Sequence, residues 1–269
     1  MRFESAWIGN RALLAFIALS ITAVPFAADA ADCIVKAHST ARLGAASKGV
    51  ISVVHVERGD RVTLGQVLAE LESSDEVHRK ALAQLRADND APILTARNRA
   101  ETAEAKVKRL TTLNDRKFAT QADLEAALLE ASTARLDEQQ ADLDREIARE
   151  EARSASSALE RKMVRAPFDG VVVERILSRG ELYNEQEPIV VVARVHPLHV
   201  ETFLPLALHA RLKVGDKLAI ALETGDQAEG AVTVIDPVLD AATGTFGVRL
   251  EVPNPDWKIL AGQRCTVDP

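Results

Sequence analysis

Two short stretches far apart in the chain share one order of apolar and polar positions. An apolar run after Gly49 leads to a turn at Gly59, and an apolar run after Gly170 leads to a turn at Gly180. The stretches align without a gap when Gly49 is placed on Gly170. Short apolar runs bounded by turn residues indicate strands, and a repeat interrupted by an insert indicates one domain in two halves. The alternative is a pair of unrelated hairpins in a β protein.

The glycines of the repeat have a physical reason. A tight turn places a residue at positive φ, which Gly adopts without strain. The sequence therefore predicts that Gly49, Gly59, Gly170 and Gly180 are structural turn residues. A lone two-stranded hairpin is marginal in water, so we expect the two halves to bury their apolar faces against each other.

The insert between the halves has the pattern of long helices. Residues 75–163 contain no glycine and one proline, and they are rich in strong helix formers such as Ala, Leu, Glu and Arg. Apolar residues in the first arm recur at alternating spacings of four and three, which is typical of a coiled-coil seam. The predicted seam comprises Ala96, Ala100, Ala103, Val107 and Leu110 in the first arm and Leu129, Leu136, Leu143 and Ile147 in the second.

The turn between the arms is predicted just before Thr120. The segment TQAD that begins there matches a capping box, in which the Thr oxygen accepts from the third-residue amide and Asp123 reaches back. Pro92 lacks an N–H and interrupts the first arm. We expect the helix to kink or restart at this point, with Asn89 or Asp90 as a cap.

The N-terminus has the pattern of an export signal. Two arginines precede an apolar run over residues 12–24, and the small-residue motif ADA follows at residues 28–30. The run is shorter than the roughly 18 residues that a membrane span needs. Residues 1–30 are therefore predicted to be a cleaved signal peptide, with a retained anchor as the alternative. Asp32 precedes Cys33 where a lipobox has Gly, Ala or Ser, so we expect no lipidation.

Charge and cysteine content narrow the partners and the compartment. The formal net charge is −7, whereas a nucleic-acid partner requires clustered Lys and Arg, so none is expected. The cysteines, Cys33 and Cys265, lie near opposite ends of the chain. Export to an oxidising compartment favours a disulfide. Because pairing needs a proximity that sequence does not show, the bonded and the free states both stay open at this point.

The motifs together resemble the periplasmic adaptor subunits, or membrane fusion proteins, of bacterial tripartite efflux pumps. SKGVISVVHVERGDRVTLGQVLAELESSD is similar to the first half-lipoyl motif of that family, and VRAPFDGVVVERILSRGELYNEQEP is similar to the second. The stretch from Pro197 to Gln263 resembles the β-barrel domain of the family. The resemblance implies a mixed α and β fold, in which a long coiled-coil hairpin interrupts a split lipoyl-like β-domain and a small β-barrel domain follows.

The resemblance also implies domain boundaries. The chain stops at Pro269, soon after the closing stretch of the barrel, so the membrane-proximal domain of the family is expected to be absent or vestigial. The expected parts are a signal peptide (1–30), a segment feeding the barrel (31–46), a first lipoyl half (47–74), the hairpin (75–163), a second lipoyl half (164–193) and the barrel (194–269).

For function, the resemblance implies a periplasmic adaptor that forms an export duct. Its implied partners are an inner-membrane transporter, with the RND type favoured, an outer-membrane channel, and further copies of itself in a hexamer. Arg109, Leu113 and Thr120 match the tip pattern that contacts the channel in the family. Capping alone would also explain Thr120, and seam packing alone Leu113. Because Cys33 and Cys265 lie beside the first and last barrel segments, we expect them to pair.

Other functions have weaker support in the sequence. Lipoyl and biotinyl carriers present a modifiable Lys, where this chain has Glu76. His196 and His199 could suggest a metal pair, but no Cys, Asp or Glu follows at ligand spacing. We therefore expect no catalytic, cofactor or metal site, and no enzymatic activity. The second functional candidate is the adaptor of an ABC-type exporter of peptides or proteins.

Overall fold

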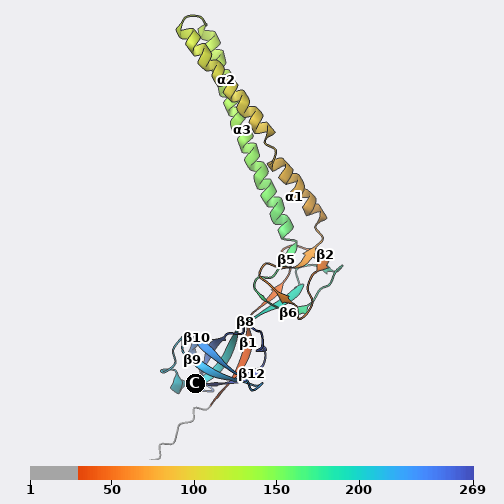
Figure 1. Cartoon of the computed structure of the whole chain (residues 1–269), viewed down its shortest axis with the longest axis vertical. Coiled ribbons are helices and arrows are strands. Elements are labelled where there is room, and N and C mark those ends of the chain that lie inside the picture. Colours follow the sequence, from red (N-terminus) through yellow and green to blue (C-terminus); the bar gives the residue numbers. More distant parts are fainter. Residues whose placement is uncertain (1–29) are drawn as a thin grey trace, which may run out of the picture.

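The computed structural model describes residues 30–269 and shows an elongated molecule with three parts in a row (Figure 1). A β-barrel contains both the first and the last described strands. A smaller β-domain adjoins the barrel, and a helical hairpin projects from the far side of the smaller domain. The predicted signal peptide lies outside the described residues, except for its last position.

Six strands close the barrel in the order β1-β12-β9-β10-β11-β8, and β8 returns to pair with β1. Closure pairs both edges of each of these strands. Alternate residues point inward, as in β9, where Leu218, Ile220 and Leu222 are buried. The barrel strands are β1 (Ala31–Leu43), β8 (Val190–Pro205), β9 (Lys217–Leu222), β10 (Gln227–Asp240), β11 (Thr245–Val252) and β12 (Arg264–Asp268), with a 3-10 turn η1 (Leu206–Leu208) after β8.

The smaller β-domain is assembled from both sides of the helical insert. Its strands are β2 (Gly49–Val54), β3 (Arg61–Val62), β4 (Val67–Leu71), β5 (Met163–Arg165), β6 (Gly170–Arg175), β7 (Leu182–Tyr183) and the start of β8. Strand β2 pairs with β7, β3 with β6, and β4 with β5. One core unites Ile51, Leu68 and Leu71 with Val164, Val172 and Ile189. The predicted split β-domain is confirmed.

The sequence repeat corresponds to a pseudo-twofold arrangement of this domain. In the repeat, β2 is equivalent to β6, and β3 is equivalent to β7. Strand β2 pairs with β7, and β6 pairs with β3 in the same way. The Gly59 amide donates to the Val172 carbonyl over 2.9 Å, and the Gly180 amide donates to the Ile51 carbonyl over 2.8 Å. These two hydrogen bonds are equivalent by the repeat. The alternative of two unrelated hairpins is therefore excluded.

Only two of the four predicted turn glycines occupy turns. Gly59 and Gly180 have φ values of 96° and 88°. Gly49 and Gly170 instead begin strands β2 and β6, outside the positive-φ region. A Cβ on Gly170 would lie 2.4 Å from the Ala193 carbonyl oxygen, whereas a Cβ on Gly49 would meet its nearest atom, a leucine methyl, at 3.4 Å. Close backbone approach, not a turn, therefore requires glycine at position 170.

We expect alanine at Gly59 or at Gly180 to lower the free energy of unfolding by about 1 kcal/mol. A Cβ at either position has no heavy atom within 4 Å, so the cost comes from the backbone conformation and not from a clash. Urea denaturation of each variant measures it, with Arg58→Ala at the exposed preceding position as the control. Unchanged stability in both glycine variants would contradict the strained turns.

The hairpin consists of α1 (Ser74–Ala87), α2 (Ala91–Asp115) and α3 (Gln121–Glu160). It ends before the predicted limit of residue 163, because Met163 already belongs to β5. The first arm restarts before Pro92, whose missing N–H is tolerated in a first helical turn. The Asn89 side-chain oxygen accepts the Ala91 amide over 3.2 Å, whereas Asp90 makes no side-chain cap. Within residues 30–269, each helix is too short or too polar to cross a membrane.

The two arms pack through alanines, and the predicted seam is correct for the first arm only. Ala96, Ala100 and Ala103 are buried as predicted. The predicted second seam is wrong, because its four residues, called the leucine stripe below, are 49–69% exposed: Leu129, Leu136, Leu143 and Ile147. The positions of α3 that are buried or half-buried are Leu124, Ala127, Ala131, Ala134, Glu138, Ala141, Arg145, Ala148, Ala152, Ala155, Ser156, Ala158 and Leu159.

Two charged residues interrupt the alanine row of α3. Glu138 pairs with Arg97 of α2 over 3.0 Å, and Arg145 pairs with Asp90, which precedes α2. Alanine allows the helix axes to approach closely, and the long charged side chains reach across the same interface. The interface therefore combines small apolar contacts with specific ion pairs.

The two β-domains share a continuous two-stranded ribbon. Strand β8 contributes Val190 and Val192 to the core of the smaller domain and then Leu198 and Val200 to the core of the barrel. Strand β1 pairs with β8 along almost its whole length. The predicted boundary between residues 193 and 194 thus falls inside a strand, and the segment 31–46 feeds both domains.

Candidate functional site

The end of the hairpin farthest from the barrel is an ordered turn (Figure 1). The amide of Lys117 donates to the Asn114 carbonyl, and the amide of Phe118 donates to the Leu113 carbonyl, both over 2.8 Å. Lys117 has a φ of 62°, so α2 ends with a left-handed residue, as many helices do. The backbone of the turn is thereby held in one conformation.

The predicted capping box at the start of α3 is confirmed. The Asp123 amide donates to the Thr120 hydroxyl oxygen over 3.1 Å, and the Thr120 amide donates to the Asp123 carboxylate over 3.2 Å. The Thr120 hydroxyl also donates to that carboxylate, which lowers the pKa of Asp123. Thr120 therefore has a structural role, and its exposed position also leaves it accessible.

Arg109 and Leu113 lie one turn apart on the outer face of α2. With Ala105, Lys108 and Thr112 they line a shallow hollow near the tip. Leu113 is 41% exposed, so seam packing does not account for it. Within residues 30–269, the Arg109 guanidinium makes no hydrogen bond or ion pair. Its donors are therefore free to bind carbonyl or carboxylate acceptors of a partner.

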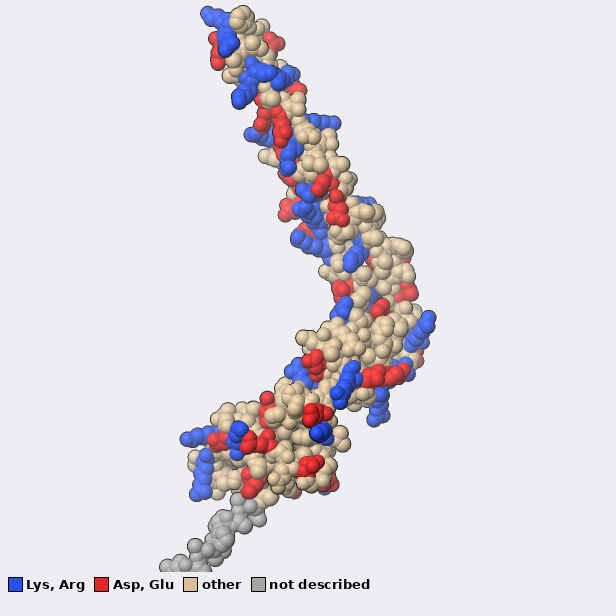
Figure 2. All heavy atoms as spheres, in the orientation of Figure 1, with Lys and Arg blue, Asp and Glu red and all other residues tan. Residues whose placement is uncertain are grey.

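Phe118 was not identified by the sequence reasoning, yet it is the most exposed aromatic side chain described. It lies in the turn and is 80% exposed. The available signal was an aromatic residue in a polar turn of a chain with only 4% aromatics. Lys and Arg side chains project from the same end of the molecule (Figure 2). Below, the tip surface means Arg109, Leu113, Phe118 and Thr120.

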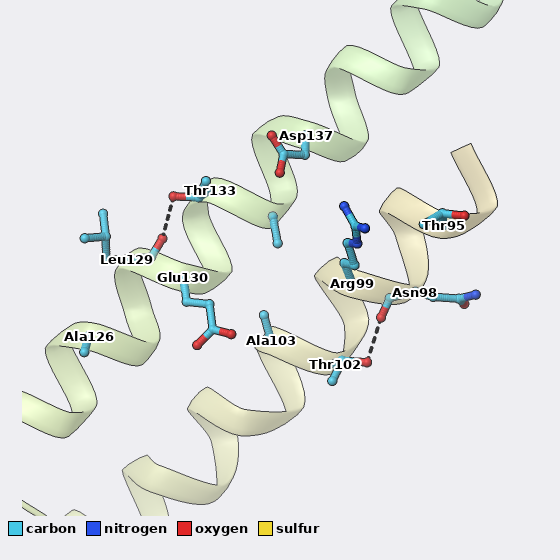
Figure 3. Close-up of a pocket in the computed structure, with 11 residues that line it drawn as sticks. Thr95, Asn98, Arg99, Thr102, Ala103, Ala126, Leu129, Glu130, Thr133 and Asp137 are labelled. Carbon is cyan, nitrogen blue, oxygen red and sulfur yellow. Dashed lines mark hydrogen bonds between the residues drawn. The ribbon is translucent and has the colours of Figure 1, made fainter. Parts of the chain in front are cut away.

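A second surface feature is a groove between α2 and α3 (Figure 3). The Thr102 hydroxyl donates to the Asn98 carbonyl over 2.7 Å, and the Thr133 hydroxyl donates to the Leu129 carbonyl over 3.0 Å. Both hydroxyl protons are thus used in hydrogen bonds to the backbone and are not available to a ligand. Small-molecule sites enclose most of their ligand, so an open groove such as this one fits a partner helix better. It is lined by Thr95, Asn98, Arg99, Thr102, Ala103, Ala126, Leu129, Glu130, Thr133, Ala134 and Asp137.

The histidines near the start of the barrel segment have separate environments. The backbone amide of Asn254 donates to His196 Nδ1 over 2.9 Å. The side-chain amide of Asn254 donates to the carbonyls of Val195 and Ile259. His196 thus has a structural role. His199 instead lies against His38, with ring centroids 4.2 Å apart.

The position of a carrier lysine is occupied by an ion pair. Glu76, in the first turn of α1, lies 3.6 Å from the Lys162 ammonium, and both side chains are mostly buried. A carboxylate at this place offers no amine for an acyl or carboxyl group.

Comparison with known proteins agrees with this architecture. Residues 39–194, more than half of the chain, match the family described as CzcB-like, barrel-sandwich hybrid domain, and residues 198–268 match the CusB-like, beta-barrel domain. The cobalt-zinc-cadmium resistance protein CzcB of Cupriavidus metallidurans is 27% identical over 233 residues, which cover 86% of this chain and 42% of that protein. This chain therefore spans less than half the length of that relative.

Two further proteins show similar relationships. The efflux pump periplasmic linker BepD of Brucella suis is 26% identical over 252 residues, covering 85% of this chain and 59% of BepD. The crystal structure of MacA from Actinobacillus actinomycetemcomitans superposes with a TM-score of 0.70 at 18% identity, covering 88% of this chain and 76% of MacA, which shows the shared fold. The split β-domain, the helical hairpin, the barrel and both family matches establish that this chain belongs to the membrane fusion proteins, the periplasmic adaptors of efflux pumps.

Proposed function

We propose that this protein bridges an inner-membrane transporter and an outer-membrane channel, and that its tip surface contacts the channel. The observation that carries the proposal is the placement of Arg109, with no partner among the described residues, and of exposed Leu113 and Phe118 at the end of the hairpin, far from the barrel (Figure 1). Aromatic and arginine side chains are the usual anchors of protein interfaces. The protein acts by assembly and not as an enzyme.

The leucine stripe supports assembly of several copies side by side. Its four apolar side chains recur along α3 and remain 49–69% exposed. An extended apolar surface on a soluble protein marks an interaction site. Neighbouring hairpins would cover the stripe and form the wall of a duct, with six copies as in the family.

The barrel favours an RND-type transporter as the inner-membrane partner. It matches the CusB-like barrel family, and the name of that family includes the abbreviation RND. The similarity to MacA is one of fold only and does not favour either transporter class. An adaptor for an ABC-type exporter is the second candidate function. Copurification of the protein with its transporter from solubilised membranes, followed by mass spectrometry, distinguishes the two.

Reversing one charge at the tip tests the channel contact. We expect Arg109→Asp to leave the melting temperature unchanged, because the side chain is exposed and forms no ion pair within the described part of the chain. Docking should weaken by about 2 kcal/mol or more if Arg109 is a central anchor. The measurements are thermal melting of the purified variant, and crosslinking to the channel with efflux in cells.

The matched control is Arg149→Asp, the same reversal at an exposed position of α3 away from the tip. It should retain crosslinking and efflux. An Arg109→Asp variant that melts normally and also crosslinks and exports at the wild-type level would exclude the tip as the contact. The family assignment would then stand without this site.

A further inference from the structure

We propose that His38, His199 and Glu251 form a binding site for a divalent transition metal ion, with Zn²⁺ as the test ion. The site lies on the barrel beside the ribbon that joins the two β-domains. It differs from the His196–His199 pair considered from the sequence, and it adds a metal site where the sequence indicated none. It does not depend on the proposed bridging function.

Three neighbouring strands bring the ligands together. His199 of β8 is directly opposite Glu251 of β11. Strand β1 pairs with β8 along the edge opposite to β11. His38 belongs to β1 and lies where the register shifts between Ala37 and Ser39. One ligand atom from each of the three residues lies within 4.8 Å of the others. This region lies near the joint between the two β-domains, because β8 passes from the core of the smaller domain at Val192 to the core of the barrel at Leu198.

A neighbouring row of charges on the same strands provides an internal comparison. There, Arg249 donates to Glu201 over 3.0 Å, and Lys36 also pairs with Glu201. The side chains of His38, His199 and Glu251 make no hydrogen bond or ion pair with any residue in the range 30–269. The charged groups of Lys36, Glu201 and Arg249 are thus paired with one another, whereas the polar atoms of His38, His199 and Glu251 have no such partners among the described residues.

The observation that points most directly to a ligand is the imidazole of His38. Its Nδ1 atom is buried and has no hydrogen-bond partner among the described residues. Buried polar atoms in proteins are nearly always paired, because an unpaired one loses its hydrogen bond to water without a replacement. A metal ion bound to His38, His199 and Glu251 would supply partners for all three side chains.

The ligand set fits the chemistry of zinc. Two imidazoles and one carboxylate are a common set for Zn²⁺, with metal–ligand distances of about 2.0–2.2 Å that place tetrahedral ligands about 3.4 Å apart. The present ligand atoms lie within 4.8 Å of one another, so metal binding would require the side chains to rotate closer together. The fourth position would hold water. With nitrogen and oxygen ligands and no thiolate or thioether, a borderline ion is preferred to a soft one.

The surroundings also favour the neutral form of the His199 imidazole. Burial is the main cause that lowers the pKa of His199, and the proximity of His38 and Arg249 adds to it. A neutral imidazole is the form that binds metals. All three residues are partly buried, so the site is shielded without being closed to entry.

The test is titration of the purified, tag-free protein with Zn²⁺ in a calorimeter. We expect one Zn²⁺ per chain and a higher melting temperature with the ion bound. His199→Gln and Glu251→Gln should each weaken binding at least tenfold. His78→Gln, at an exposed position of α1, is the control and should bind as the wild type does.

Two outcomes would overturn the site. One is a wild-type protein that binds no Zn²⁺ at one equivalent. The other is a pair of glutamine variants that fold, as judged by circular dichroism, and bind like the wild type. Because Glu251→Gln preserves size and shape, it remains informative if a histidine variant fails to fold. Visible absorption of bound Co²⁺, lost on addition of Zn²⁺ and in Glu251→Gln, would provide independent support.

Discussion

Removal of the Cys33–Cys265 disulfide is expected to cost about 5 kcal/mol of unfolding free energy. Cys33 of β1 lies directly opposite Cys265 of β12, and the bond joins residues separated by 232 positions. A crosslink between such distant residues removes many conformations from the unfolded chain, and chain-entropy reasoning gives the quoted magnitude. Urea denaturation of the Cys33→Ala, Cys265→Ala double variant and of the oxidised wild type measures the difference.

The reduced wild type is the matched control, because it lacks the crosslink but keeps both side chains. It should lose nearly as much stability as the double variant. Titration of the unreduced protein, exported to the periplasm, should find no free thiol. Two titratable thiols, or equal stability of the oxidised and reduced proteins, would contradict the expected effect.

Alanine at Gly170 is expected to lower the unfolding free energy by about 3 kcal/mol, a cost typical of overpacking. The added Cβ would lie 2.4 Å from the Ala193 carbonyl oxygen, which belongs to the backbone of β8 and cannot rotate away. The pairing of β6 with β8 would therefore have to shift. Denaturation monitored by circular dichroism gives the magnitude.

Gly49→Ala is the control for this variant, because Gly49 is equivalent to Gly170 in the repeat. Its nearest atom would be 3.4 Å from the new Cβ, an ordinary contact, so the loss should stay below about 1 kcal/mol. Equal losses in the two variants would show that the close approach at Gly170 is not what restricts this position.

Local signals were sufficient to predict much of this fold. The turn glycines Gly59 and Gly180 marked equivalent points of two half-domains, because few other residues tolerate positive φ. The absence of glycine in residues 75–163 marked the hairpin. The capping box involves two residues only three positions apart, Thr120 and Asp123, so it could be predicted from the sequence alone.

The remaining features depend on contacts between distant segments. Leucines and alanines of α3 follow the same spacing, and only the close packing of the arms decides that Ala127 and Ala152 are buried while Leu129 and Leu136 are exposed. At Gly170, the approaching backbone of β8 was not visible from the turn-like motif.

The candidate sites show the same division. The match of Arg109, Leu113 and Thr120 to the family pattern indicated the tip, but the exposure of Phe118 depends on how the turn folds. The grouping of His38 with Glu251 requires the closed order of the barrel strands, which the spacing of residues along the chain does not encode.

Two of the ion pairs between the arms, Arg97–Glu138 and Asp90–Arg145, bear on how far the stalk reaches. A row of alanines looks nearly the same after a slip of one heptad, so it fixes the alignment of α3 only weakly. Sliding α3 by one heptad in one direction would set Arg145 against Arg97, and sliding it in the other would set Glu138 against Asp90. Like charges meet in both cases, and the present pairs, Arg97–Glu138 and Asp90–Arg145, are lost. These four charges, together with the Lys106–Glu130 and Glu104–Arg135 pairs nearer the tip, therefore help to fix the distance from the smaller β-domain to the tip.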